Sequence, residues 1–546
     1  MLRQLMRASA QRNGAWAVLM CAALYALEAP AAASGPAPIP SFVHQDGRHA
    51  LLVDGAPFLI LGAQVNNSSN YPGMLPQVWP AIAQLHANTV QVPVAWEQIE
   101  PREGQFDFSF LDVLLPQARE HGVRVILLWF GTWKNNNLMY APEWVKVNNG
   151  KYPRVINPKG ERMGSLSPLG AATLAADRKA FAALMRHLKS IDAKRTVIMV
   201  QVENETGTYG SVRDFSPAAQ KVFDAPVPKE LLQALKKKPG SWKQSLGADA
   251  DEFFHAWHIA RFVEQVTAAG KAEYALPMYV NAALRDPLKP SPPTTYSSGG
   301  PTDNVIDVWK AAAPSIDLIA PDIYMPDFER YIRVLELYSR PDNALFVAET
   351  GNAMSYAPLF FATLGHQGIG FAPFGMDFTG YSNFPLGAPK VDDEVLAHFA
   401  LNYRLVGPMA RELAKLSFEG KLFAVSESAA THRQVLPMKG RWRASVAYGL
   451  GQFGNAEPPG NAKPMGGALV AQLGENEFLV TGRHARVEFG LADPKSGLKL
   501  QFLRVEEGEY SDGEWRFLRV WNGDQVDWGL NFTSVPQVLR VRLSTY

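Results

Sequence analysis

Eight short apolar segments of β-strand character recur between residues 58 and 374, and segments of helical periodicity separate them. Strands that alternate with helices form a parallel sheet, because each helix returns the chain to the end from which the next strand starts. Eight such units predict an α/β fold, a (β/α)8 or TIM barrel. The predicted strands are Phe58-Leu61, Thr89-Val94, Val123-Phe130, Val197-Val202, Met278-Asn281, Ile316-Pro321, Leu345-Ala348 and Ile369-Phe374.

The barrel pattern is longer than a plain barrel requires, and the pattern changes after it ends. Segments 134–168 and 206–249 are rich in Pro, Gly and Asn and too long for ordinary connections, so they are candidate lids or substrate-binding loops. From about Asn402 short alternating segments separated by turn signals predict a smaller C-terminal all-β sandwich domain. The predicted division is a signal peptide at 1–33, a linker at 34–41, the catalytic barrel at 42–400 and the sandwich at 401–546.

The N-terminus has the order of features of a secretory signal: arginines, then an apolar stretch, then small residues. These are Arg3, Arg7 and Arg12, then residues 15–27, then Ala31-Ala32-Ala33. A membrane anchor is the alternative, but the apolar stretch is shorter than the roughly 20 residues that a spanning helix needs. A lipid attached at Cys21 fits less well, because the chain stays apolar beyond it. The sequence therefore predicts a secreted or periplasmic protein that starts near Ser34 and has no membrane segment in its mature form.

Composition excludes several classes of function. The chain has 53 Lys and Arg against 52 Asp and Glu, and no basic run longer than residues 236–238, so nucleic-acid binding is not expected. The single cysteine, Cys21, lies in the signal, which excludes disulfides and thiol chemistry from the mature chain. The closest histidine pair, His255 and His258, has no partner carboxylate motif, and no glycine-rich phosphate loop follows the first strand. No metal or cofactor is predicted.

Two glutamates follow predicted strands at the end of the barrel where active sites form. Glu205 ends the fourth strand and Glu349 ends the seventh, so the two side chains can meet over the barrel axis from opposite walls. Hydrolysis of a glycosidic bond with retention needs one carboxylic acid that protonates the leaving oxygen and one carboxylate that attacks the anomeric carbon. Either glutamate alone could instead cap a helix or pair with an arginine. Their joint occurrence favours catalysis, with Glu205 as acid/base and Glu349 as nucleophile.

The fourth strand carries a motif that resembles a known family. The run Gln201-Val202-Glu203-Asn204-Glu205 matches the acid/base motif of the family 35 β-galactosidases of clan A, and the stretch from Trp96 to Phe108 is similar to their segment after strand two. The resemblance implies an exo-acting β-galactosidase that works by double displacement, with Asn204 as the ligand of the sugar 2-hydroxyl. The C-terminal domain resembles one appended to a bacterial subgroup of these enzymes.

The sequence also departs from that family. After strand three the family usually has a glutamate that holds the galactose ring, whereas this chain has Thr132. The ring would then be held by other groups, such as Asn66, Asn135 or Asn136. The alternative is another clan A retaining glycosidase, a family 42-type galactosidase or an endo-acting mannanase or glucanase. A sugar-binding protein on an inactive barrel would require that one glutamate be absent or misplaced.

Several neighbours of the two glutamates are candidate supporting residues. Strict alternation along a strand would direct Glu203 and Glu205 to one side and Asn204 to the other, so a strand-end irregularity is expected, and Glu203 has either a supporting role or a structural ion pair. Clan A enzymes commonly place a tyrosine after strand six that bonds the nucleophile, which suggests this role for Tyr324.

The remaining candidates are aromatic and amide side chains near the strand ends. Trp96, Trp129 and Trp133 could stack on a sugar ring or pack in the core, and Asn281 could bond sugar hydroxyls or form a turn. The expected partner is a carbohydrate, a β-galactoside, and the all-β domain offers a surface for a possible homodimer.

Overall fold

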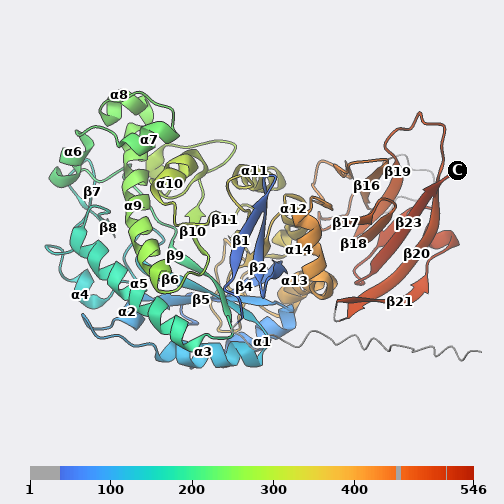
Figure 1. The fold of residues 1–546 in the computed structure, drawn as a ribbon, viewed down its shortest axis with the longest axis horizontal. Helices are drawn as coiled ribbons and strands as arrows, with labels where there is room; N and C mark the ends of the chain where they lie inside the picture. The colour runs from blue at the N-terminus through green and yellow to red at the C-terminus, as the bar shows by residue number, and fades with distance from the viewer. Residues whose placement is uncertain (1–36, 450–456, 512) are drawn as a thin grey trace, which may run out of the picture. The chain divides into compact units, whose positions relative to one another are not determined.

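Eight parallel strands close into a barrel in the order in which they occur in the sequence, so the predicted TIM barrel is confirmed (Figure 1). The computed structural model describes residues 37–449, 457–511 and 513–546. The predicted signal peptide lies outside these residues. The barrel strands are β4 (Ile60–Gln64), β5 (Thr89–Ala95), β6 (Arg124–Lys134), β9 (Val197–Asn204), β10 (Met278–Ala283), β11 (Leu318–Ile323), β12 (Val347–Thr350) and β13 (Gly370–Pro373).

Alternation along the strands divides the core into two layers. On β6, Ile126, Leu128 and Phe130 lie in the cluster that fills the barrel, whereas Leu127 and Trp129 lie in the layer between strands and helices. The principal helices that follow the eight strands are α1 (Leu75–Leu85), α3 (Ser109–Glu120), α5 (Ala171–Ile191), α9 (Ala250–Glu273), α10 (Ile306–Ala312), α11 (Phe328–Tyr338), α12 (Leu359–Gly365) and α13 (Asp393–Val406).

The two predicted insertions carry structure of their own. The segment after β6 contains helix α4 (Glu143–Lys146) and the paired strands β7 (Arg154–Ile156) and β8 (Arg162–Leu166). The segment after β9 contains three short helices, α6 (Pro217–Phe223), α7 (Lys229–Ala234) and α8 (Trp242–Leu246). Both insertions therefore leave the end of the barrel at which the two glutamates lie.

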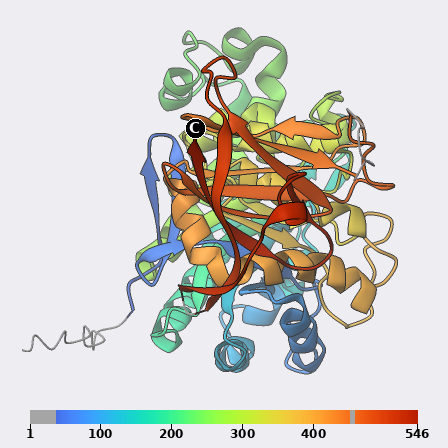
Figure 2. The ribbon, with the colours of Figure 1, turned by 90° about the vertical axis from the view of Figure 1, so that its right-hand side faces the viewer.

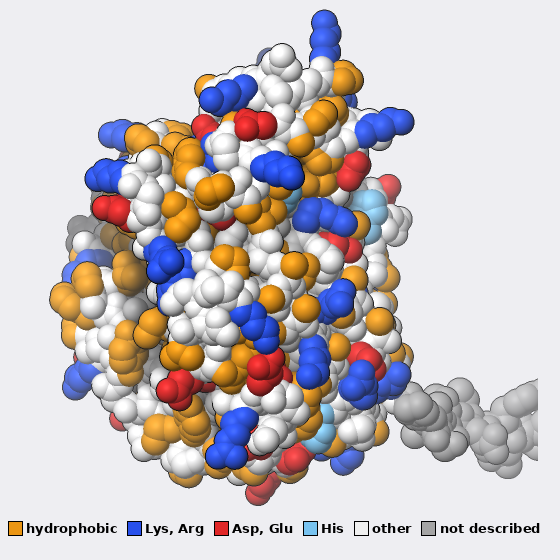
Figure 3. Space-filling model, turned by 90° about the vertical axis from the view of Figure 1, so that its left-hand side faces the viewer, with side chains coloured by type: hydrophobic (Ala, Val, Ile, Leu, Met, Phe, Trp, Pro, Cys, Tyr) orange, Lys and Arg blue, Asp and Glu red, His pale blue; other side chains and the backbone are white. Residues whose placement is uncertain are grey.

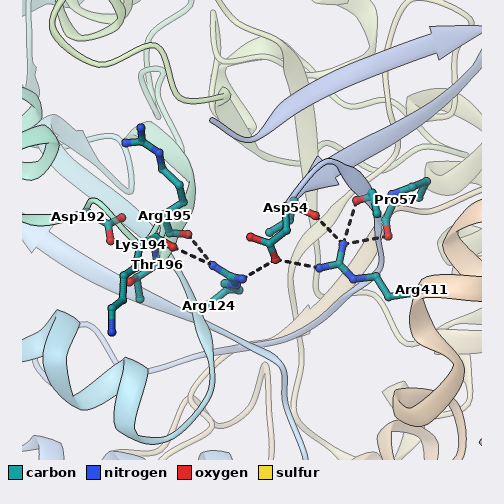
Figure 4. Close-up of polar contacts among 10 residues, drawn as sticks. Asp54, Pro57, Arg124, Asp192, Lys194, Arg195, Thr196 and Arg411 are labelled. Carbon is teal, nitrogen blue, oxygen red and sulfur yellow. Dashed lines mark hydrogen bonds and ion pairs between the residues drawn. The ribbon is translucent and has the colours of Figure 1, made fainter. Parts of the chain in front are cut away.

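A three-stranded sheet precedes the barrel and closes its other end. It consists of β1 (Ser41–Gln45), β2 (Arg48–Val53) and β3 (Ala56–Phe58). Leu51 and Val53 belong to the apolar cluster inside the barrel. At the turn after β2, Asp54 bonds Arg124 of β6 and Arg411 of helix α14 (Ala410–Phe418) (Figure 4). The N-terminal end of the barrel is thus covered by a hairpin that ion pairs hold in place.

The C-terminal region forms two antiparallel sheets, as predicted (Figure 2). Their inner faces share one apolar cluster that includes Trp442, Phe478 and Leu539. One sheet has the order β14-β17-β18-β23-β20-β21, and the other has the order β15-β16-β19-β22. The strands are β14 (Leu422–Ser426), β15 (Arg433–Val435), β16 (Trp442–Tyr448), β17 (Gly467–Gly474), β18 (Glu477–Arg483), β19 (Ala485–Leu491), β20 (Leu500–Ser511), β21 (Glu514–Val520), β22 (Leu530–Phe532) and β23 (Val538–Thr545).

Direct hydrogen bonds join this β region to the barrel helices. The Ser426 hydroxyl at the end of β14 accepts from the Ala362 amide of α12 at 2.8 Å. Arg483 of β18 is buried and donates to the His398 carbonyl of α13 at 2.8 Å. Strand β14 therefore lies against the helix that follows the strand of Glu349.

On the surface, acidic and basic side chains are interspersed over the face that Figure 3 shows, without a large patch of one sign. Within the described part of the chain, no helix has the length and apolar character needed to cross a membrane.

Candidate active site

Glu349 is the third residue of β12, and its side chain is only 5% exposed. The Gln64 side chain, at the end of β4, donates to Glu349 Oε2 at 3.0 Å. The Tyr324 hydroxyl, just after β11, donates to Glu349 Oε1. Two donors fix the orientation of the carboxylate and stabilise its charged form. The structure thus places Tyr324 beside Glu349, as the sequence predicts, and adds Gln64.

Glu205 follows β9 through an irregular strand end. Glu203 and Glu205 both have left-handed backbone conformations, with φ of +62° and +45°. Such conformations are uncommon for residues other than glycine and break the alternation of the strand, which re-aims the side chains. The amide of Glu205 donates to Asn281 Oδ1 of β10 at 2.9 Å. The irregularity expected from the Glu-Asn-Glu run is therefore present, and Asn281 is one of the groups that hold it.

The protonation of Glu205 is linked to that of Glu349. Burial, and then the negative charge of Glu349, raise the pKa of Glu205 to about 7, while the Lys134 ammonium acts in the opposite direction. A carboxyl group with this pKa can hold a proton near neutral pH and can release it during a reaction. The two glutamates thus differ in environment in the way that an acid/base and a nucleophile require.

A third carboxyl group, which sequence reasoning missed, lies between them. Asp322 on β11 is directly opposite Glu349 of β12 in the parallel register and is 3% exposed. The Asn281 amide donates to Asp322 Oδ2 at 2.6 Å. Burial and the neighbouring charges of Glu349 and Glu205 raise the pKa of Asp322 well above its usual range. Its place at a strand end, two residues before Tyr324, was the available signal.

Asn204 is buried beside the acid/base. Lys134, the last residue of β6, donates to Asn204 Oδ1 at 2.9 Å. The side-chain nitrogen of Asn204 has no hydrogen-bond partner within the described residues. An amide donor left open in this position can bind a hydroxyl group of a ligand, which agrees with the role that the family resemblance implies for Asn204.

Glu203 points away from the mouth and contacts Asp177, a fully buried residue of α5. The Trp133 amide donates to Glu203 at 2.8 Å, and the hydroxyl of Thr132 donates to Asp177 at 2.5 Å. A Cβ atom on Gly131 would lie 2.9 Å from an oxygen of each carboxyl group, so glycine is needed here. Burial raises the pKa of both Asp177 and Glu203. Glu203 therefore supports the strand end from behind, and Thr132 faces α5 rather than a sugar.

Of the two roles that the sequence leaves open for the three tryptophans, stacking on a sugar ring and packing in the core, the structure shows core packing. Trp96, Trp129 and Trp133 have no exposed surface. Trp129 donates to Asp177 at 2.9 Å and Trp96 donates to Glu100 at 3.0 Å, whereas Trp133 packs edge to face against a phenylalanine of α9. Strand β6 continues to Lys134, so Trp129 and Trp133 lie within the strand and face the helix layer. All three are core residues.

Two of the amide candidates, Asn66 and Asn281, hold the protein's own polar groups. Asn66, in the loop after β4, donates from its backbone and side chain to Asp377, at 2.7 and 2.8 Å, and so joins the first and last loops of the mouth. Its Oδ1 atom is buried without a partner in the described structure. Asn281 bonds Glu205 and Asp322, as above, so it positions carboxyl groups rather than presenting both ends of its amide to a ligand.

In the described part of the chain, no three His, Cys, Asp or Glu side chains are arranged to hold a metal ion. His255 and His258 lie on α9; His255 is fully buried and bonds the Thr208 hydroxyl.

Comparison with known proteins gives two family matches. Residues 77–242 match the model of glycoside hydrolase family 42, described as beta-galactosidase, and residues 399–533 match a domain of unknown function, DUF5597. A beta-galactosidase of Xanthomonas manihotis is 30% identical over 188 residues, which are 34% of this chain. That match covers 29% of the relative, so the chain spans less than a third of its length. The barrel is thus β-galactosidase-like in sequence, and the matched model is that of family 42 rather than family 35.

Beta-galactosidases are among the solved structures that align with part of this chain. The beta-galactosidase of the psychrophilic Marinomonas ef1 has a TM-score of 0.48 and 12% identity, over 65% of this chain and 61% of that one. Gan42B, a family 42 beta-galactosidase from G. stearothermophilus, has a TM-score of 0.46 and 16% identity, over 69% and 59%.

Proposed function

We propose that this β-galactosidase-like chain of clan A is a retaining, exo-acting glycoside hydrolase that releases terminal galactose from oligo- or polysaccharides. The observation that carries the proposal is the pair of carboxyl groups in unequal environments. Glu349 is held by two donors that favour its charge, and Glu205 has a pKa of about 7 that depends on Glu349. Such a pair can act as nucleophile and acid/base.

In the first step, Glu205 protonates the glycosidic oxygen while Glu349 attacks the anomeric carbon, and the bond to the leaving group breaks. A glycosyl ester of Glu349 forms. In the second step, Glu205, now a carboxylate, removes a proton from water, and the water oxygen attacks the same carbon and releases Glu349. Tyr324 and Gln64 keep the Glu349 carboxylate in place, and Asn204 offers its free N–H to the sugar.

The identity of the sugar is the finer part of the proposal. The family 42 model matches residues 77–242 of the barrel, and the motif of the fourth strand resembles that of family 35; both are β-galactosidase families. A family 42-type β-galactosidase is therefore the second candidate. Residue 132 is a threonine and has no carboxylate, so other groups would hold the sugar ring. Lys134 and Asn135 follow Thr132 closely in the sequence, and the Lys134 ammonium donates to Asn135 Oδ1 at 2.5 Å.

A panel of nitrophenyl glycosides tests the activity and the sugar. We expect the β-galactoside to be hydrolysed fastest, and NMR should show the β-anomer of galactose as the first product. Faster hydrolysis of a mannoside or glucoside would contradict the galactose assignment. Initial release of the α-anomer would contradict retention.

The pH profile tests the assignment of the acid. Because Glu205 must hold its proton for the first step and its pKa is about 7, kcat/KM should fall as the pH rises through about 7. A basic limb several units higher would contradict this assignment.

The N-terminal pattern supports export of the enzyme through a cleaved signal. Cell fractionation and N-terminal sequencing of the mature protein test this part of the proposal, and a product that retains Met1 would contradict it.

A further inference from the structure

Four ionisable groups meet at the floor of the mouth and have few partners of opposite charge. Three are carboxyl groups, Glu205, Glu349 and Asp322, and one is the ammonium of Lys134. Asp322 and Glu349 are buried, and Lys134 is 5% exposed. Buried charges are costly unless they are paired, so three carboxylates beside one ammonium would be strongly unfavourable. Two protons held among the carboxyl groups leave one carboxylate to balance Lys134.

The amide of Asn281 shows how Asp322 is bonded. The backbone N–H of Glu205 can only donate, so the atom of Asn281 that it meets at 2.9 Å must be the oxygen. The nitrogen of Asn281 therefore faces Asp322 Oδ2, at 2.6 Å, and donates to it. Asn281 thus connects the acid/base to Asp322 and satisfies one oxygen of Asp322 as an acceptor.

The other oxygen of Asp322 has no donor. Oδ1 is buried, and no N–H or O–H group in the described residues reaches it. The Glu205 carboxyl is also within hydrogen-bond reach of the Asp322 side chain. Two carboxyl groups make a favourable contact only if a proton lies between them. Asp322 is enclosed and directly opposite Glu349, whereas Glu205 is partly exposed at the mouth. The less hydrated group is the one that favours its neutral form.

We propose that Asp322 is a positioning residue that keeps a proton on Oδ1 and donates it in a hydrogen bond to the Glu205 carboxyl. The proton stays on Asp322 through both steps of the reaction, and Glu205 alone gives and takes the proton that is transferred. The bond orients Glu205 and stabilises its carboxylate after the leaving group has gone. This role rests on the proposed function of Glu205, but the protonation of Asp322 does not.

The shifts in proton affinity agree with this assignment. Burial raises the pKa of Asp322 well above its usual range, and its hydrogen bond to Glu205 lowers the pKa of Glu205 against the effects of burial and of Glu349. The titratable or charged groups that face Asp322 come from the segment directly after β9, from β12, β6 and β10, from the end of its own strand and from α11. They are Glu205, Glu349, Lys134, Tyr279, Tyr324 and Tyr338.

The pH profile of kcat/KM on a nitrophenyl β-galactoside separates a neutral from a charged Asp322. D322N is uncharged, like a protonated aspartic acid, and keeps a hydrogen-bond donor. The basic limb of its pH profile should therefore stay within about 0.3 pH units of that of the wild type, and its kcat/KM within about tenfold. D322L removes the donor, so the limb should move up by about one unit and kcat/KM should fall by more than about tenfold. D214N is the matched control, a buried aspartate bonded to Ser167 and Ser216, and should leave the limb unchanged.

A basic limb that moves down by about one unit in D322N would show that Asp322 had been ionised, and would overturn the proposal. A wild-type profile in D322L would do the same. Thermal unfolding identifies a variant that does not fold, and D322N alone still decides between the two charge states.

An infrared measurement needs no catalysis. E205Q at neutral pH should show the C=O stretch of a protonated carboxyl that E205Q/D322N lacks, and the Asp177 and Glu203 pair cancels in the difference spectrum. No difference between the two would overturn the proposal. If E205Q and E349Q leave hydrolysis unchanged, the proposed function fails, whereas the infrared band still reports on Asp322.

Discussion

The two ends of the barrel use buried carboxyl groups in opposite ways. At the N-terminal end, Asp192 follows α5, has no exposed surface and accepts from Arg119 and from two backbone amides at 2.8 Å (Figure 4 shows Asp192 beside Thr196). At the C-terminal end, Asp322 and Glu205 contact each other, as do Asp177 and Glu203. A carboxylate that meets donors stabilises the fold, whereas carboxyl groups that meet each other retain protons that chemistry can use.

The exposed charges sharpen the contrast. Asp54 pairs with Arg124 at 2.6 Å and Arg411 at 3.2 Å, and all three side chains remain partly in water. Arg411 also donates to the backbone carbonyls of Val53 and Ala56 at the hairpin turn. At the mouth, Lys134 is the nearby cation, and it faces the carboxyl groups from within the protein. The carboxylates described at the N-terminal end are paired with arginines, whereas at the C-terminal end, where a substrate would bind, the carboxyl groups outnumber the nearby cation.

The largest effect should come from removing either catalytic carboxyl. E205Q and E349Q should each lower kcat/KM at least about a thousandfold, because each removes a group that reacts. Their thermal stability should be equal to that of the wild type or higher, because buried like charges are relieved. Azide should restore activity to E349G more than to the wild type. Unchanged activity in either Gln variant would contradict the proposed function.

The opposite outcome is expected at the other end of the barrel. D192A leaves Arg119 and two backbone amides without their acceptor, so the free energy of unfolding should fall by about 3 kcal/mol. Urea unfolding measures this loss, and D192N should lose less because it keeps one acceptor. The kcat of folded D192A should match the wild type, and a large loss of kcat would show that the two ends are not independent.

The buried Asp177 and Glu203 pair should appear in the pH dependence of stability. Burial raises the pKa of both above the values of the unfolded chain, so the folded protein keeps protons that the unfolded chain releases as the pH rises. The free energy of unfolding should therefore decline as the pH rises through the raised pKa values. E203Q removes one of these groups and should show a flatter decline in urea unfolding from roughly pH 5 to 9. An equal decline of the free energy of unfolding in E203Q and in the wild type would show that Glu203 does not retain a proton in the folded protein.

The smallest effect should be at the exposed ion pairs. D54N should lower the free energy of unfolding by about 1 kcal/mol or less, because solvent screens these charges. The difference from the wild type should shrink further in high salt, and kcat should not change. A loss that persists in salt would mean that the turn, rather than charge, is the main contribution of Asp54.

The sequence was sufficient for the barrel and for its two principal carboxylates, because strand ends mark positions that face the mouth. Glu205 and Glu349 are found by that rule alone. Asp177 was not found, since it lies within an amphipathic helix whose pattern does not show a bond to β6. Trp133 was misplaced because β6 runs four residues beyond its predicted end. The partners of a side chain depend on such lengths and registers, which periodicity does not define.

The close packing of β14 against α12 has a consequence for the evolution of this protein. Gly365 lies so close to Ala424 that an added Cβ would be 2.0 Å from its carbonyl oxygen, and the Ser426 hydroxyl completes the contact with Ala362. A barrel cut off after α14 would expose this face of α12, the helix that follows the strand of Glu349. The C-terminal sandwich is therefore not a module that recombination can exchange freely, and we expect the two parts to have been passed on as one unit.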